Sequence, residues 1–165
     1  MGKLTPFIKK LNPIRLIMPM EKIKILLIDY EEDFIKNLSE RIKSRNLELD
    51  LAVKGNQALE LIVNEKPDVI ILNLDTPDVV GMELLRDVKI IYPDIQVIIL
   101  SRHYSIQDRM EALVAGAYML FEKPVDIDDL IKTILRAYKE DRTTIKRALN
   151  NRLKFKLKTS ESFPE

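Results

Sequence analysis

Residues 68–81 read DVIILNLDTPDVVG and contain the strongest indication of the fold. The first six residues have the length of a strand, and residues 69–72 form an apolar run rich in β-branched side chains, which is typical of a strand covered on both faces of a sheet. The run ends at Asn73, and the polar residues with Pro77 that follow are typical of a loop. The segment therefore predicts a buried strand with a polar side chain at its carboxyl end.

Four more segments have the length and composition of strands, and they alternate with helical patterns. The predicted strands are 23–29, 48–53, 68–73, 95–101 and 118–122. The predicted helices are 32–45, 56–65, 81–91, 105–115 and 127–140. Five repeats of strand and helix imply a parallel sheet with right-handed crossovers. The expected fold class is a doubly wound α/β domain with helices on both faces of a five-stranded sheet.

Polar side chains stand where the predicted strands end. The first strand ends at Asp29 and Tyr30, the third at Asn73 and the fourth at Ser101, and the fifth runs into Lys123. In doubly wound sheets the functional crevice lies at the carboxyl ends of the strands. We therefore expect a carboxylate, an amide, a hydroxyl and an ammonium group to share one pocket.

The order of these residues resembles the receiver domain of two-component response regulators over residues 23–140. An acid closes the first strand, NLDTPDVVG at 73–81 stands where the family has Asp-x-x-x-Pro-x-x-x-Gly, and GAYMLFEKP at 116–124 completes the pattern. Each piece alone is a weak pattern, and their joint order and spacing carry the resemblance. It implies the flavodoxin-like strand order 2-1-3-4-5 and a role in phosphorelay signalling.

The resemblance also implies a chemistry for the pocket. In the family, a carboxylate on the third strand attacks a phosphohistidine or a small acyl phosphate, assisted by magnesium that acids of the first strand hold. A carboxylate can act as a nucleophile, magnesium prefers carboxylates and waters, and a lysine with a hydroxyl holds the phosphoryl group. By position, Asp29 is the first acid, Ser101 the switch hydroxyl and Lys123 the lysine.

Three positions depart from the family pattern. Asn73 replaces the acceptor aspartate, and a neutral amide has neither the charge nor the basicity to attack phosphorus. Tyr30 replaces the second magnesium-binding acid, and a phenol, with a pKa of about 10, is a poor magnesium ligand near neutral pH. Leu120 replaces the switch aromatic of the fifth strand. We expect no phosphorylation at the usual site, no enzymatic activity, no cofactor, and weak or absent magnesium binding.

Alternative interpretations of the pocket stay open. With Asp29 the only clear acid retained there, Lys123 could neutralise it directly and close the site without a cation. In a purely structural interpretation, Lys123 only pairs with Asp29 and Ser101 only caps the following loop. Asp75, two residues beyond Asn73, is an alternative acceptor.

The ends of the chain differ in charge from its middle. Residues 1–20 carry four basic residues and no acids, and residues 142–165 carry seven basic residues against two acids. Residues 21–141 carry 24 acids against 16 basic residues. We expect a flexible basic N-terminal extension at 1–20 and the receiver-like domain at 21–141. The basic C-terminal extension at 142–165 is expected to be helical to about residue 150 and then extended or disordered.

Composition excludes several kinds of site. The chain of 165 residues contains no cysteine, which excludes disulfides, thiolate metal sites and cysteine nucleophiles. It has neither an apolar run of about 18 residues nor the pattern of a secretory signal. The sequence therefore predicts a cytoplasmic protein.

Three functions are compatible with these features. The favoured one is a pseudo-receiver that acts by protein contact, with a partner or as a homodimer. The expected contact face is formed by the fourth helix, the fifth strand and the fifth helix, at 105–115, 118–122 and 127–140. The second function is a phosphorelay receiver with an unorthodox acceptor such as Asp75. The third is nucleic-acid binding through the basic tail, which could instead dock on an acidic surface.

Overall fold

The computed structural model describes residues 22–160, apart from the side chains at 146, 150 and 153–160. The extension predicted at 1–20 therefore lies outside the described residues, as do residues 161–165. In the described part, no helix is both long enough and apolar enough to cross a membrane.

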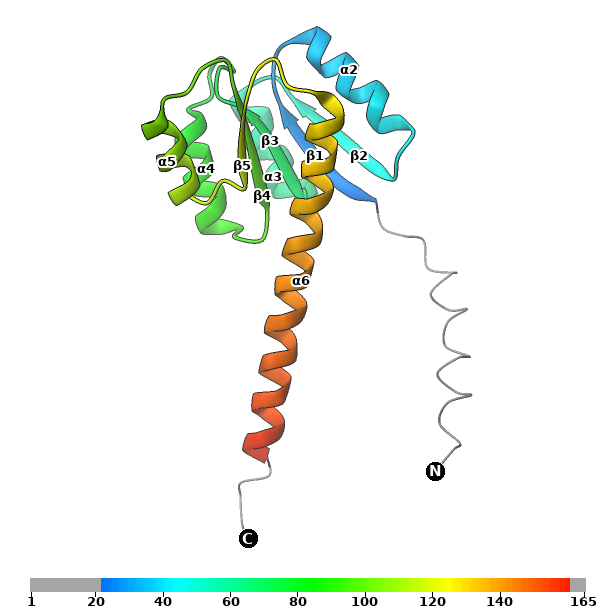
Figure 1. Cartoon of the computed structure of the whole chain (residues 1–165), viewed down its shortest axis with the longest axis vertical. Helices are drawn as coiled ribbons and strands as arrows, with labels where there is room; N and C mark the ends of the chain where they lie inside the picture. The colour runs from blue at the N-terminus through cyan, green and yellow to red at the C-terminus, as the bar shows by residue number, and fades with distance from the viewer. Residues whose placement is uncertain (1–21, 161–165) are drawn as a thin grey trace.

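Five parallel strands form a single sheet (Figure 1). They are β1 (Ile23–Ile28), β2 (Leu47–Ala52), β3 (Val69–Asn73), β4 (Gln96–Ser101) and β5 (Met119–Glu122). Their order across the sheet is β2-β1-β3-β4-β5, and every neighbouring pair is parallel. The predicted fold class and strand order are thus confirmed, with each strand within one residue of its expected bounds.

Helices cover both faces of the sheet. They are α2 (Glu32–Lys43), α3 (Gly55–Glu65), α4 (Gly81–Ile91), α5 (Ile106–Val114) and α6 (Ile127–Ser160). One core contains buried residues of α3, α4 and α5, and the other contains buried residues of α2 and α6. Successive β1 residues alternate between these two cores, because successive strand side chains point to opposite faces.

The loop after β3 closes tightly against the start of α4. Gly81 is the last residue of the NLDTPDVVG segment and the first residue of α4. A Cβ atom at this position would lie 2.5 Å from Cδ2 of Leu74, so any larger residue would displace that side chain. The glycine therefore lets Leu74, at the beginning of this loop, pack against the start of α4.

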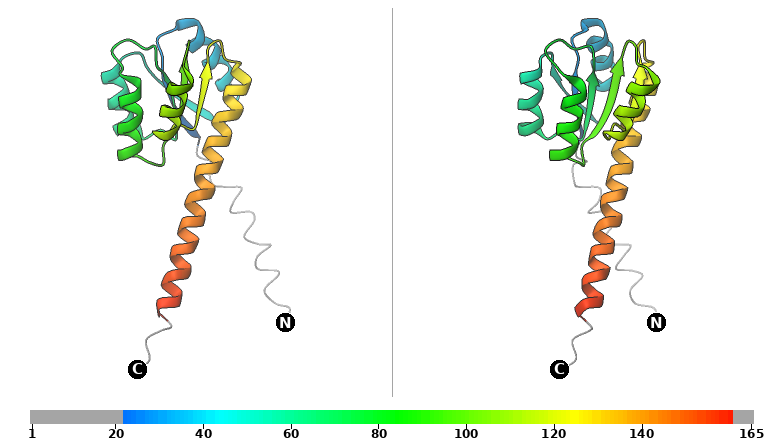
Figure 2. Two further views of the ribbon diagram at one scale, coloured as in Figure 1. Left: turned by 60° about the vertical axis from the view of Figure 1, so that its left-hand side comes forward. Right: turned by 90° about the vertical axis from the view of Figure 1, so that its left-hand side faces the viewer.

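The length of α6 corrects the sequence-based expectation for the C-terminal extension. The helix continues to Ser160, whereas we expected an extended or disordered chain beyond about residue 150. The alternation of Leu153, Phe155 and Leu157 favours a strand only where a neighbouring strand can pair with it. A helix satisfies its backbone groups locally, and 127–160 contains no glycine or proline to stop it. The distal half of α6 consequently projects beyond the body of the domain (Figures 1 and 2).

Candidate functional site

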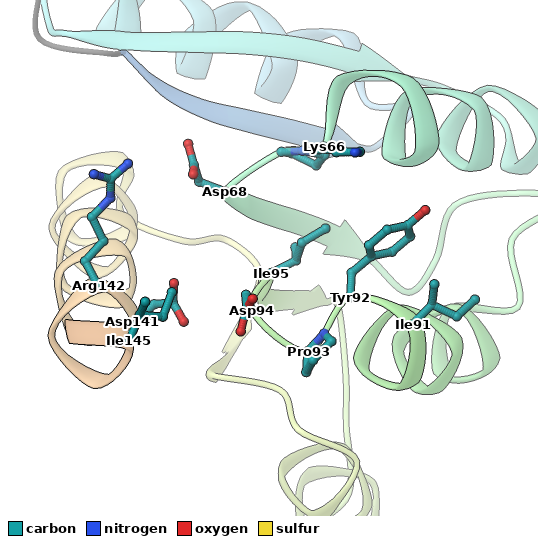
Figure 3. Close-up of a pocket in the computed structure, with 11 residues that line it drawn as sticks. Lys66, Asp68, Ile91, Tyr92, Pro93, Asp94, Ile95, Asp141, Arg142 and Ile145 are labelled. Carbon is teal, nitrogen blue, oxygen red and sulfur yellow. The ribbon is translucent and has the colours of Figure 1, made fainter. Parts of the chain in front are cut away.

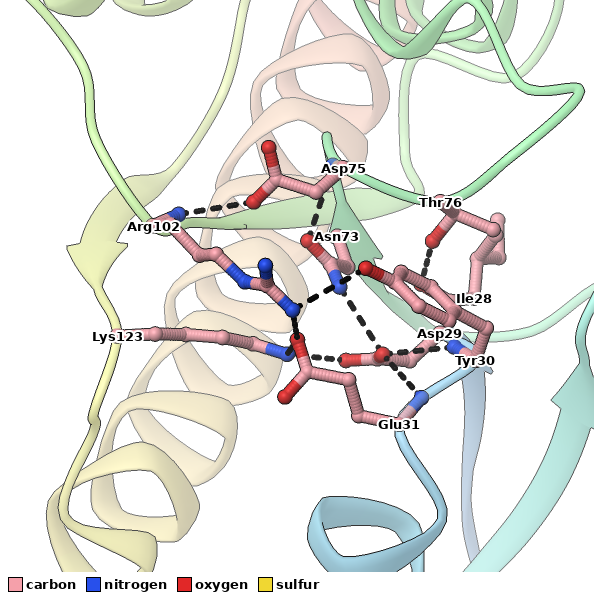
Figure 4. A network of polar contacts seen from close by, with 9 residues as sticks. All are labelled: Ile28, Asp29, Tyr30, Glu31, Asn73, Asp75, Thr76, Arg102 and Lys123. Atoms are coloured by element: carbon pink, nitrogen blue, oxygen red, sulfur yellow. Dashed lines mark hydrogen bonds and ion pairs between the residues drawn. The ribbon is translucent and has the colours of Figure 1, made fainter.

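The strand ends bring most of the expected pocket residues together at one edge of the sheet. Asp29 and Tyr30 follow β1, Asn73 ends β3, and Lys123 follows β5. Figure 4 shows these four side chains converging, with Asp29 at the centre. These four residues therefore lie in one pocket, as the sequence predicted.

Asp29 is fully buried and accepts four hydrogen bonds. Its Oδ1 accepts from the backbone N–H groups of Tyr30 at 2.7 Å and Glu31 at 3.0 Å. The same oxygen accepts from the side-chain Nδ2 of Asn73 at 3.0 Å, and Oδ2 accepts from Nζ of Lys123 at 2.8 Å. The ionised carboxylate is thus compensated by one cation and by three further donors.

Asn73 is fully buried and uses both ends of its amide. Its Nδ2 donates to Asp29, and its Oδ1 accepts from the backbone N–H of Asp75 at 3.0 Å. A carboxylate at this position would have no hydrogen to donate when ionised, and it would bring a second negative oxygen against Asp29. The asparagine therefore fits the site as a structural link between β1 and β3.

Lys123 bridges two carboxylates at the pocket. Besides Asp29, its ammonium lies 3.2 Å from Oε1 of Glu31, and it stands over the ring of Phe34 at 4.5 Å from the centroid. Its side chain is only 8% exposed. Asp29 was expected to be the only clear acid retained in the pocket, and Glu31 also reaches the pocket from the N-terminal end of α2. The run of acids Glu31, Glu32 and Asp33 was the available signal, but their direction was not readable from sequence.

Arg102 is a pocket residue that sequence analysis left without a role. Its Nη2 donates to the phenol oxygen of Tyr30 and to Oε1 of Glu31, both at 3.2 Å. The hydrogen bond with Glu31, and next the phenol of Tyr30, raise the pKa of the Arg102 guanidinium above its ordinary value. The position directly after β4 was the signal that could have identified it. Arg102 therefore links the loop after β4 to the loop after β1.

Asp75 faces this same loop. Its Oδ2 accepts from the backbone N–H of Arg102 at 2.9 Å, and its own N–H is held by Asn73. Figure 4 shows its carboxylate directed at Arg102, on the other side of Asn73 from Asp29. The carboxylate of Asp75, the alternative phosphoryl acceptor, is therefore held by the backbone N–H of Arg102.

Ser101 and Leu120, the two predicted switch positions, make contacts typical of structural residues. Ser101 is buried, and its Oγ donates to the backbone carbonyl of His103 at 2.8 Å, as the loop-capping interpretation expects. Leu120 is 5% exposed and belongs to the core under α3, α4 and α5. The neighbouring aromatics Tyr118 and Phe121 pack against the opposite core. Position 120 therefore holds an aliphatic side chain within the core, and the nearby aromatic rings pack on the other face.

The carboxylates at the centre of the site are engaged by donors of the same chain. Both oxygens of Asp29 accept hydrogen bonds, and Glu31 contacts Lys123 and Arg102. Within residues 22–160, no group of three or more histidine, cysteine, aspartate or glutamate side chains is placed to hold a metal ion. The chemistry that the described side chains support is a closed network of opposite charges.

A second hollow of about 490 Å³ lies at the opposite edge of the sheet, beside α6 (Figure 3). Three carboxylates line it, those of Asp68, Asp94 and Asp141, together with the cations Lys66 and Arg142. Burial, and next the charge of Asp94, raise the pKa of the Asp141 carboxyl above its ordinary value. This hollow is far from the strand ends and contains none of the predicted pocket residues.

Comparison with known proteins adds an independent result. Residues 25–135 match the family described as response regulator receiver domain. The chain is 32% identical over 107 residues to sporulation initiation phosphotransferase F of Bacillus subtilis (strain 168), covering 65% of this chain and 86% of that protein. It is 33% identical over 110 residues to the transcriptional regulatory protein GlrR of Escherichia coli (strain K12), covering 67% of this chain but 25% of that protein.

Solved structures agree with this match. The receiver domain of the Francisella response regulator 1452 superposes with a TM-score of 0.67 at 28% identity, covering 72% of this chain and 98% of that chain. A CheY-like receiver domain protein from Methanospirillum hungatei JF-1 gives a TM-score of 0.70 at 24% identity, with 74% and 98% covered. The latter supports the fold alone.

Proposed function

Because the chain belongs to the response regulator receiver domain family, we propose that it serves two-component signalling as a pseudo-receiver, without phosphorylation at position 73. The observation that carries the proposal is the hydrogen bond from the amide of Asn73 to the buried carboxylate of Asp29. In the family this position holds the nucleophile, and here it holds a donor that completes a charge-compensated network. In this proposal the chain is not an enzyme.

The proposal extends to magnesium. Magnesium would have to displace Lys123 from Asp29. The residue that follows Asp29 at the end of β1 is Tyr30, which has no carboxylate to bind the cation. We propose that the ion pair takes the place of the metal, since a buried carboxylate requires one positive partner and has one. The pocket then keeps the same charge state with or without magnesium.

Magnesium addition tests this part of the proposal. A ligand that binds only the folded chain raises its stability by mass action, by about 2.7 kcal/mol at one hundred times its dissociation constant. We expect the melting temperature to be the same with and without millimolar magnesium, after correction with an equal ionic strength of sodium. A saturable increase specific to magnesium would contradict the proposal, and a phosphorylatable receiver domain measured in parallel shows that the assay detects such binding.

Protein contact is the remaining route to a signal, and α5 offers a surface for it. Ile106, Met110 and Val114 recur every four residues, which places them on one side of the helix. They are 80%, 62% and 88% exposed. Exposed apolar side chains gathered on one face are typical of binding surfaces. We propose that the face of α5, β5 and α6 contacts a protein partner through this apolar stripe, and that the basic extension of α6 provides a second contact surface.

A further inference from the structure

The distal part of α6 has apolar side chains that its own chain leaves partly exposed. Residues 142–160 carry seven basic residues and no acids. Ile145 and Leu149 are 37% and 54% exposed, and leucines at 153 and 157 continue the same spacing of four in the sequence. Helices in proteins gain most of their stability from packing of an apolar face. A surface that packs on this segment should therefore be apolar and acidic.

The described chain carries one such surface on α3 and the edge strand β2. On α3, Leu59 and Val63 are 55% and 54% exposed and are also spaced by four. Together α3 and β2 contain four acids and no basic residue: Glu48, Asp50, Glu60 and Glu65. The neighbouring cations are Lys24, whose Nζ lies 3.8 Å from Oε2 of Glu65, and the two lysines that flank α3, at 54 and 66.

The acids of this surface are crowded. Burial, then Glu65 and Glu48, raise the pKa of the Asp50 carboxyl, although the charge of Lys24 lowers it in part. An additional cation would relieve this repulsion. Rows of side chains spaced by four also form the ridges that interdigitate when two helices pack. Charge and spacing thus agree between the α3–β2 surface and the distal part of α6.

The two surfaces cannot meet within one chain. In each view the distal part of α6 runs away from the body that contains α3 and β2 (Figures 1 and 2). We infer that residues 142–160 of one copy dock on α3 and β2 of a second copy, and that the exchange is reciprocal. A reciprocal contact closes as a two-fold dimer and does not continue into a filament. It leaves the apolar stripe of α5 free for the partner of the proposed function, on which this inference does not depend.

Light scattering across a dilution series tests the inference with the full chain. We expect a dimer at low salt whose dissociation constant rises at least about tenfold at about 0.5 M salt, where the Debye length is roughly 4 Å. Val63→Gln on α3 should weaken the dimer at least about tenfold, because it places a polar amide in the apolar contact. The matched variant Val114→Gln, on the exposed stripe of α5, should leave the dissociation constant unchanged.

Cross-linking identifies the contact directly. Carbodiimide treatment of a mixture of ¹⁴N- and ¹⁵N-labelled chains should join lysines of 142–160 to Glu60 or Glu65 in mixed-isotope peptides. A monomer at all concentrations would overturn the inference, as would a dimer that Val114→Gln dissociates and Val63→Gln does not. Binding of the monomer to anionic vesicles or to DNA, without self-association, would also overturn it and would assign the basic segment to those ligands.

Discussion

At position 73, an amide performs two tasks that a carboxylate cannot perform together at neutral pH. It donates to the buried oxygen of Asp29 and accepts from the backbone of Asp75, so it ties β3 to β1 and to its own loop. With an ionised aspartate the two carboxylates would repel each other, and a cation would be needed between them. The residue type at position 73 thus sets how much negative charge the pocket has to compensate.

The pair of Lys123 and Asp29 yields a stability prediction. Lys123→Met should destabilise the fold by about 3–5 kcal/mol in urea unfolding, because it leaves a fully buried carboxylate without its cation. Adding Asp29→Asn should recover much of that loss, since the uncompensated charge is then gone. The exposed pair of Lys132 and Asp129 provides the control, and Lys132→Met should cost less than about 1 kcal/mol. Equal losses at the two lysines would show that the buried pair has no special role.

Asp141 yields a prediction on pH. Its pKa is raised in the folded chain, by burial first and by Asp94 next, so ionisation of this carboxyl opposes folding. The opposition is absent below the ordinary pKa of 3.8 and is complete once the pH exceeds the raised pKa. Asp141→Asn should therefore raise the melting temperature at pH 7 and leave it unchanged near pH 3. A lower melting temperature of the variant at pH 7 would show that the attraction of Asp141 to Lys89 outweighs the cost of burial and the repulsion by Asp94.

Sequence identified some of these residues and missed others for a physical reason. Asp29, Asn73 and Lys123 lie at strand ends, and the parallel sheet fixes where strand ends meet. Glu31 and Arg102 reach the pocket from loops through long side chains with several rotatable bonds. Their position depends on rotamers and on each other, which spacing along the chain does not encode.

Among the elements, α5 begins with a capping box. The side chain of Ser105 accepts from the backbone N–H of Asp108 at 3.0 Å, and the carboxylate of Asp108 accepts from the backbone N–H of Ser105 at 2.8 Å. This capping box fixes the start of the helix that carries the exposed apolar stripe. The exposed apolar stripe therefore lies on a helix whose N-terminal end is held by a capping box.

Ser105→Ala should destabilise the chain by about 1 kcal/mol, because the backbone N–H of Asp108 loses its side-chain acceptor. Urea unfolding measures the effect. Ser44→Ala is a suitable control, since the Ser44 hydroxyl is exposed and donates to a carbonyl at 3.4 Å at the other end of a different helix. If the two alanine variants unfold at the same urea concentration, the cap contributes nothing measurable.

The strands were predictable as elements because their apolar runs are covered on both faces, and this requirement leaves a clear pattern in β1, β3 and β4. The end of α6 was not predictable in the same way. Beyond about residue 150 the period-two pattern of the apolar residues competes with good helix-forming composition, and only the absence of a neighbouring strand decides between them.

At the scale of the whole molecule, charge separates the parts of the chain. An acidic body carries a long basic helix that leaves it at the edge opposite the pocket (Figure 1). The order β2-β1-β3-β4-β5 could be expected from the resemblance, because alternating strands and helices allow few topologies. The acidic surface on α3 and β2 arises only when the fold places a helix beside an edge strand.

The central claim is that the pocket signals without accepting a phosphoryl group, and intact-mass spectrometry tests it most directly. The full chain is incubated with magnesium and a small acyl phosphate, with a phosphorylatable receiver domain as the positive control. We predict that the mass of this chain stays unchanged while the control gains one phosphoryl group. A gain of one phosphoryl group that Asp75→Ala abolishes would contradict the claim and assign Asp75 as the acceptor.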